Sequence, residues 1–134
     1  MAEVPRPSDR RPIWSDWIPF DLEVVISRVP MHIGVFRTRV VGADELIFVG
    51  SATGKQGLAE AVRRRARDIS HVSPAEADRK YYLCPEEKEV IAQGQKLEVS
   101  FAAAATAAEA KLWKAALIGQ CKPRGNKQQP RLYR

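Results

Sequence analysis

Two β-type runs separated by a short turn give the clearest structural signal in the chain. Residues 32–41 (HIGVFRTRVV) alternate in character and are rich in β-branched side chains. Gly42, Ala43 and Asp44 interrupt this run, and residues 45–49 (ELIFV) resume it. Alternation with a period of two on both sides of a short turn is typical of an antiparallel β-hairpin. We therefore expect a fold built on an antiparallel sheet.

A helix is predicted to follow the hairpin. Residues 50–57 (GSATGKQG) are small and polar, which is typical of a loop. From residue 58 to about residue 69, apolar side chains recur at helical spacing on one face. Most arginines of this segment lie outside that face, but Arg65 lies on the apolar stripe itself. The pattern thus predicts an amphipathic helix with one exceptional basic residue.

The second half of the chain adds a strand between two helices. Pro85 suits the first position of a short helix over residues 85–92. Residues 96–101 (KLEVSF) alternate as a strand, and residues 106–119 form an alanine-rich helix for which Gly119 is a plausible stop. Trp113 lies at core spacing in that helix, so we expect it to be buried.

The length of the chain, 134 residues, fits a single domain with one core. We expect an α+β domain over residues 13–126, with the element order β-β-α-(α)-β-α and a three-stranded, mainly antiparallel sheet flanked by helices. Residues 73–76 (SPAE) mark a further helix start, and residues 22–27 fit either a short strand or a helical turn. Polar, proline-rich residues 1–12 predict a flexible lead-in, and residues 127–134 a basic tail.

Composition excludes several classes of protein. No run of about 18 apolar residues exists, so we expect no membrane span, and the polar start lacks the apolar stretch of a signal peptide. A cytoplasmic protein is therefore the expectation. Cys84 and Cys121 lie far apart, and with only His32 and His71 they make a poor zinc set. We expect two free, partly buried thiols.

Positive charge is concentrated near the C-terminus. The formal net charge is +6, and the segment from residue 122 to residue 134 carries five positive side chains and no acid. These side chains are Lys122, Arg124, Lys127, Arg131 and Arg134. A basic tail beside a nearly neutral body suits a polyanion such as nucleic acid. A solvated tail that aids solubility would show the same pattern.

The hairpin carries short motifs in a familiar order. Residues 34–36 read Gly-Val-Phe, residues 48–50 read Phe-Val-Gly, and Gly57-Leu58 then opens the arginine-rich helix. Near the far end, Leu117-Ile118 is followed by Lys122-Pro123 and Asn126. From about Val29 to Asn126 the chain resembles the GIY-YIG nucleases, whose strands read Gly-Ile-Tyr and Tyr-Ile-Gly. The resemblance marks Gly34, Gly50 and Asn126 as structural motif residues.

The same resemblance implies that the cutting groups are replaced. Family members cut phosphodiester bonds with a tyrosine hydroxyl, an arginine against the phosphate and a glutamate that holds one divalent cation. The positions that match both tyrosines, the arginine and the glutamate are Phe36, Phe48, Ala61 and Lys114. Phenylalanine has no hydroxyl, and an ammonium repels a metal ion instead of ligating it. No catalytic group is therefore expected to persist, and no metal or other cofactor is expected.

Two nearby residues are candidates to replace the lost catalytic groups. Arg65 lies one turn beyond Ala61 and reaches toward the same phosphate in a divergent enzyme. Glu109 is the nearest candidate for the lost carboxylate, but it lies about 140° around the helix from Lys114. In that reading magnesium or manganese would be the cofactor. Lys114 itself suits direct binding of a phosphate as a point charge.

Three hypotheses follow. The first is a catalytically degenerate GIY-YIG-like domain that binds nucleic acid through basic residues. The second is a divergent metal-dependent endonuclease that uses displaced residues, and the third is a protein-interaction or regulatory module without nucleic acid. Besides the five basic residues from Lys122 onward, the candidate nucleic-acid-binding residues are Lys55, Arg63, Arg64, Arg65 and Arg67. The arginines of this cluster also fit an ordinary solvated helix face.

Overall fold

The computed structural model describes residues 11–69 and 83–126. Within these ranges an antiparallel sheet of four strands has the order β1-β4-β2-β3. The strands are β1 (Ile18–Pro19), β2 (Gly34–Val40), β3 (Leu46–Ala52) and β4 (Leu97–Ala103). The helices are α1 (Leu22–Arg28), α2 (Gly57–Ile69), α3 (Pro85–Ala92), α4 (Ala107–Cys121) and the 3-10 turn η3 (Arg124–Asn126). Most of the expected lead-in, the helix start at residues 73–76 and the tail from residue 127 lie outside the described residues.

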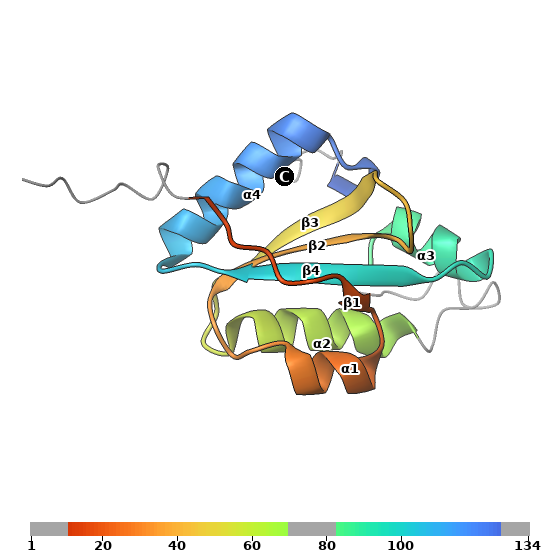
Figure 1. The fold of residues 1–134 in the computed structure, drawn as a ribbon, viewed down its shortest axis with the longest axis horizontal. Helices are drawn as coiled ribbons and strands as arrows, with labels where there is room; N and C mark the ends of the chain where they lie inside the picture. The colour runs from red at the N-terminus through yellow and green to blue at the C-terminus, as the bar shows by residue number, and fades with distance from the viewer. Residues whose placement is uncertain (1–10, 70–82, 127–134) are drawn as a thin grey trace, which may run out of the picture.

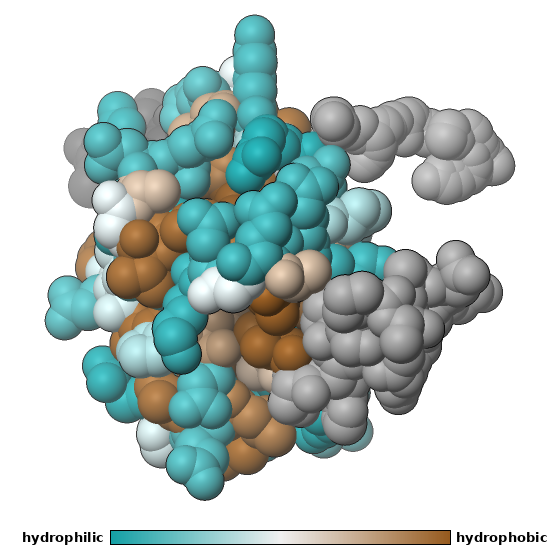
Figure 2. Space-filling view, turned by 90° about the vertical axis from the view of Figure 1, so that its right-hand side faces the viewer, coloured by the Kyte–Doolittle hydropathy of each residue, from teal (hydrophilic) through white to brown (hydrophobic). Residues whose placement is uncertain are grey.

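The elements form layers around the sheet. Helix α4 crosses one face, whereas α1 and α2 lie side by side on the other, with α3 beside one end of the strands (Figure 1). The space-filling view of the α3 end shows mainly hydrophilic residues with hydrophobic ones between them (Figure 2). The expected α+β class, with an antiparallel sheet flanked by helices, is confirmed.

The predicted hairpin is present. Strands β2 and β3 pair antiparallel, with Phe36 opposite Gly50 and Thr38 opposite Phe48. Phe36 and Phe48 therefore lie on neighbouring strands, as expected. Strand β3 extends to Ala52, beyond the predicted end at residue 49, because its last residues continue to pair with the start of β2.

The sheet buries a different core on each face. On the side of α1 and α2, the larger core includes Phe36, Ile47 and Leu58. On the side of α4, a smaller core joins Val35 and Ala102 to Trp113, which is 5% exposed and thus buried as predicted. Successive residues of a strand point to opposite faces, so neighbours such as Val35 and Phe36 enter different cores.

Two expectations need correction, and one open alternative is decided. The sheet has four strands instead of three, because the two residues of β1 pair with Val99 and Glu98 of β4. Of the two alternatives for residues 22–27, the helical one is confirmed, because they belong to helix α1, which Asp21 caps by accepting from the N–H of Glu23. Helix α4 does not stop at Gly119 but continues to Cys121, and it ends where Lys122 takes a left-handed conformation with φ 46°. A helix tolerates a glycine near its end when packing supports the following turn.

Helix α2 is fixed to the sheet at its first turn. The N–H groups of Leu58 and Ala59 donate to the carbonyls of His32 and Pro30. Gly57 has φ +54°, and a Cβ there would collide with the His32 carbonyl, so only glycine permits this approach. The contact holds α2 next to the start of β2 and thereby places its side chains over Phe36.

Within the described ranges, no helix is long and apolar enough to cross a lipid bilayer.

Candidate functional site

A small cavity of about 160 Å³ lies where α2 and α4 meet the β3 edge of the sheet. Its lining residues are Phe36, Phe48, Gly50, Ser51, Ala61, Arg64, Arg65 and Lys114. The four positions that the family resemblance equates with catalytic residues, Phe36, Phe48, Ala61 and Lys114, all belong to this set. Residues from four separate elements therefore converge on one site.

Two aromatic rings form the apolar part of the cavity. The ring centroids of Phe36 and Phe48 lie 6.1 Å apart, with their planes tilted by 36°. The Phe36 ring covers Gly50 on the neighbouring strand, and a Cβ at Gly50 would collide with it. The glycine thus makes room for the aromatic ring, and no hydroxyl is present at either ring position.

The polar part of the cavity is cationic. Arg64 is exposed, Lys114 is half-buried and Arg65 is buried at 7% exposure. The Arg65 guanidinium lies 4.1 Å from the centroid of the Phe48 ring and 5.5 Å from that of Phe36. No aspartate or glutamate belongs to the lining set. The site can therefore attract an anion, but its lining residues do not fit a hard divalent cation, which needs carboxylate ligands.

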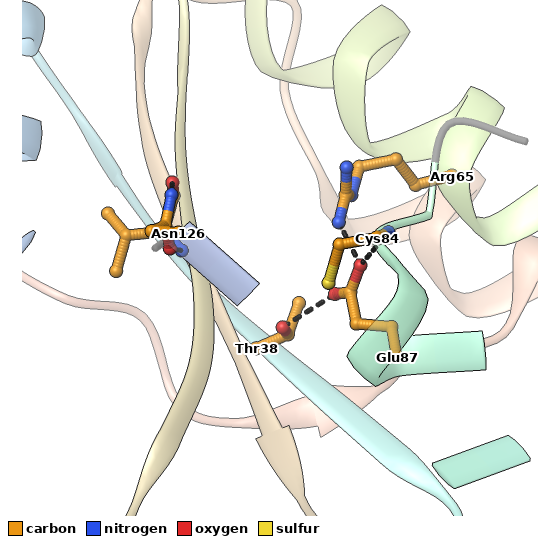
Figure 3. A network of polar contacts seen from close by, with 6 residues as sticks. Thr38, Arg65, Cys84, Glu87 and Asn126 are labelled. Atoms are coloured by element: carbon orange, nitrogen blue, oxygen red, sulfur yellow. Dashed lines mark hydrogen bonds and ion pairs between the residues drawn. The ribbon is translucent and has the colours of Figure 1, made fainter. Parts of the chain in front are cut away.

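A buried carboxylate holds Arg65 in place. Glu87 of α3 is 0% exposed and forms an ion pair with the Arg65 guanidinium (Figure 3). It also accepts from the hydroxyl of Thr38 at 2.7 Å and from the N–H of Cys84 at 3.1 Å. One carboxylate thus connects α2, β2 and the start of α3. This network explains why a basic residue lies on the apolar stripe of α2.

The thiol of Cys84 is affected by the same network. Burial raises the pKa of Cys84 to about 12, and the Glu87 carboxylate adds to the effect. The thiol is therefore neutral at physiological pH. Both cysteines are free, with Cys84 half-buried and Cys121 exposed, so the expected free thiols are present although only one is partly buried.

Asn126 binds the outer edge of β3. Its side-chain oxygen accepts from the N–H of Val49 at 2.7 Å, and its side-chain nitrogen donates to the Val49 carbonyl at 2.9 Å. The amide reproduces the pair of hydrogen bonds that a further strand would make there. Val49 is flanked in the sequence by Phe48 and Gly50, which line the cavity. Asn126 thus fixes η3 beside the site.

The remaining basic candidates lie elsewhere. Arg63 donates to the carbonyl of Ile26 at 3.3 Å and faces α1. Lys55 and Arg67 are exposed but do not line the cavity, and the same holds for Lys122 at the end of α4. Arg124 lies 3.8 Å from Glu45 at the surface. Lys127, Arg131 and Arg134 lie outside the described residues.

The two rescue candidates have different surroundings. Arg65 lines the cavity, although its guanidinium is paired with Glu87. Glu109 is 1% exposed, does not line the cavity, and accepts from the N–H of Ala105 at 2.8 Å. Thr106 in turn accepts from the N–H of Glu109, so the pair caps α4.

Sequence reasoning missed the partner of Arg65. A basic residue on an apolar stripe requires a buried acid, and the order Cys84-Pro85-Glu86-Glu87 is typical of a helix start whose third residue points back toward the chain. This pattern singles out Glu87. Ser51, within β3, belongs to a Gly-Ser-Ala run that also resembles the family, but that resemblance gave it no role in the site.

Comparison with protein-family models, curated proteins and solved structures gave no match to the chain. Among residues 11–69 and 83–126, no group of three or more His, Cys, Asp or Glu side chains is arranged to hold a metal ion.

A larger cavity, about 460 Å³, lies between α1, the end of α2 and the loop before β4, and none of the predicted site residues lines it.

Proposed function

We propose that this chain is a catalytically degenerate GIY-YIG-like domain that binds the phosphate backbone of nucleic acid without cutting it. The observation that supports this most is the content of the cavity. The four positions Phe36, Phe48, Ala61 and Lys114 share it with two arginines and with no acid. Such a set suits a bound phosphate.

The cavity lacks the side chains that cleavage of a phosphodiester bond needs. Attack on a phosphodiester needs an activated oxygen nucleophile and cations against the developing negative charge. Neither Phe36 nor Phe48 can donate or accept a proton, and Lys114 occupies the position that the resemblance equates with the metal-holding glutamate. Because the lining residues do not fit magnesium or manganese, we assign no metal-dependent step to this cavity.

The cations that remain suit binding. Lys114 extends from α4 and Arg64 from α2, so a phosphate in the cavity meets positive charge from both sides. Arg65 adds a third positive charge, but its ion pair with Glu87 reduces the positive charge that acts on a ligand. Contacts of this type are made with the backbone, so binding is weakly dependent on sequence and strongly dependent on salt.

Further basic residues that follow η3 in the sequence are candidates for additional phosphate contacts. Asn126 is bound to Val49 at the cavity edge, and Lys127 follows it directly in the chain. Asn126, the last described residue, thus lies beside the site, and the remaining basic residues follow it in the sequence. With about five phosphates neutralised, the logarithm of the binding constant on duplex DNA should fall with the logarithm of salt concentration with a slope of about −4 to −5.

The test combines cleavage and binding on the same samples. The full chain is incubated with labelled duplex DNA, single-stranded DNA and RNA in the presence of magnesium or manganese, and products are separated on a denaturing gel. We expect intact nucleic acid and a salt-dependent anisotropy change. Cleavage that is lost in Arg65→Ala or Glu109→Ala favours the divergent endonuclease. Absence of binding even at low salt favours the protein-interaction module.

A further inference from the structure

A stack of alternating indoles and guanidiniums lies on the sheet face opposite the cavity. The Arg37 guanidinium lies 4.0 Å from the ring centroid of Trp14 and 4.7 Å from that of Trp17. Arg39 lies 4.0 Å from the Trp17 centroid on the next position of the same face. Since Phe36 faces the cavity, its neighbour Arg37 points to the other side of the sheet.

The two tryptophans are fixed there by the N-terminal segment. Ser15 donates its backbone N–H to the carbonyl of Phe101, and its hydroxyl oxygen accepts from the Phe101 N–H at 3.0 Å. The hydroxyl of Ser100 donates to the Ser15 carbonyl at 2.9 Å. Residues 14–19 thus run along β4 with Trp14 and Trp17 directed over β2. The indoles are therefore held as a preformed wall beside Arg37.

The stack contains more positive than negative charge. Arg39 forms an ion pair with Glu98 at 2.6 Å. Arg37 has no carboxylate partner among residues 11–69 and 83–126, and its Nε is buried without a hydrogen bond there. Burial lowers the pKa of Arg37, the charge of Arg39 lowers it further, and the nearby Cys121 side chain acts in the opposite direction. The site thus holds a guanidinium that an anion would stabilise.

The indoles alone do not satisfy this arginine. A cation–π contact contributes about 0.5–2 kcal/mol. The N–H groups of a stacked guanidinium point outward in its own plane, however, so the indole faces do not accept their hydrogen bonds. The buried Nε of Arg37 makes no hydrogen bond within the described part of the chain. A guanidinium presents these donors as a planar fork that matches two oxygens of a phosphate.

We propose that Arg37, flanked by Trp14 and Trp17, is a phosphate-binding site on the α4 face of the sheet. The phosphate belongs either to a nucleic-acid strand or to a small phosphate compound. The site is independent of the proposed function, because it uses no residue of the cavity. A strand that crosses it would also find two indoles for stacking against its bases.

Tryptophan fluorescence of the full chain tests this site. Trp14 and Trp17 border Arg37, whereas Trp113 is buried in the core, so a bound phosphate should change the emission of the first two. Three probes are titrated: inorganic phosphate, a nucleoside monophosphate and a single-stranded oligonucleotide. We expect a saturable change with at least one probe. An oligonucleotide that binds far more tightly than equal concentrations of the small probes identifies a strand as the source, and similar affinities identify a free phosphate compound.

Variants assign the response to Arg37. Arg37→Gln should weaken binding by about tenfold or more, because it removes a charged hydrogen-bonding group. Arg37→Lys keeps the charge but loses the fork, so it should weaken binding less. Arg28→Gln removes an equal charge at an exposed residue of α1, on the opposite face of the sheet, and should leave the titration unchanged.

Two results would overturn the proposal. One is a wild-type chain whose fluorescence shows no saturable change with any probe. The other is a folded Arg37→Gln chain that binds with unchanged affinity. Circular dichroism shows whether this variant folds. If it does not fold, the same comparison is made with Arg37→Lys, and unchanged affinity of that variant would also contradict the proposal.

Discussion

The guanidinium of Arg65 and the carboxylate of Glu87 form a buried ion pair between α2 and α3. The carboxylate is fully buried and also accepts from Thr38 and from the N–H of Cys84. Arg65 lines the cavity and lies against the Phe48 ring, whereas Glu87 holds Arg65 there from outside the lining set. The stability of the fold and the charge of the site therefore depend on the same two residues.

Breaking this pair should destabilise the fold strongly. Either Arg65→Met or Glu87→Gln leaves one buried charge without its partner, which costs about 3–5 kcal/mol. The double variant Arg65→Met/Glu87→Gln removes both charges and should lose less than the two single losses combined. Urea unfolding of the three variants measures the coupling. Additive losses would mean that the two side chains do not interact.

Asn126 should contribute to stability through its two hydrogen bonds to Val49. Asn126→Ala should lower the free energy of unfolding by about 1–3 kcal/mol, because the edge groups of Val49 lose their partners. Gln120→Ala removes an exposed amide from α4 and should have little effect. Urea denaturation compares the two variants, and equal losses would show that the Asn126 contact contributes nothing specific.

Two glycine-to-alanine substitutions should change stability in opposite directions. At Gly50 a methyl group collides with the Phe36 ring, so Gly50→Ala should be destabilising by about 1–3 kcal/mol. At Gly119, inside α4, an added Cβ meets no atom within 4 Å, and alanine should stabilise the helix by about 0.5–1 kcal/mol. Thermal unfolding followed by circular dichroism gives both signs. A neutral Gly50→Ala would contradict the packing of Phe36 on that strand.

The two thiols should react at different rates. The pKa of Cys84 is raised to about 12, so its nucleophilic thiolate is scarce, whereas Cys121 is exposed. A thiol reagent near pH 8 should modify Cys121 at least about tenfold faster than Cys84. Mass spectrometry of the modified peptides measures both rates. Equal rates in the folded chain would contradict the buried environment of Cys84.

The raised pKa of Cys84 also predicts how stability depends on pH. The folded state holds the Cys84 proton more tightly than the unfolded state, whose thiol has its ordinary pKa of 9.0. The contribution is therefore fully present below pH 9 and is lost as pH rises toward about 12. Cys84→Ala should lack this part of the alkaline decrease in unfolding free energy. An identical decrease in the variant would assign it to other groups.

Local signals in the sequence predicted much of the fold. The hairpin follows from alternation on both sides of Gly42, and α3 was predicted with its observed bounds, Pro85–Ala92, because proline and the following acids mark a helix start. Strand β1 escaped prediction because its two residues, Ile18 and Pro19, acquire their strand character by pairing with residues about eighty positions later. No local pattern contains that information.

The candidate site, too, was predicted only in part from local sequence patterns. The positions Phe36, Phe48, Ala61 and Lys114 were selected from the order of short motifs, and packing brings them around one cavity. The pairing of Arg65 with Glu87, in contrast, depends on how α3 packs against α2. The helix-start pattern at residues 84–87 marks Glu87 but does not identify its partner. The stack of Trp14 on Arg37 likewise depends on the path of the N-terminal segment along β4.

Binding of a nucleic-acid phosphate in the cavity should depend on Lys114. The most direct measurement is a fluorescence-anisotropy titration of labelled duplex DNA at two salt concentrations with Lys114→Gln and Lys111→Gln. Both variants remove one lysine from α4, but only Lys114 lines the cavity, and Lys111 is exposed. We predict that Lys114→Gln weakens binding and reduces the salt slope by about one unit, whereas Lys111→Gln has little effect. Equal affinities and slopes for the two variants, or no binding by the wild-type chain at low salt, would contradict the proposed function.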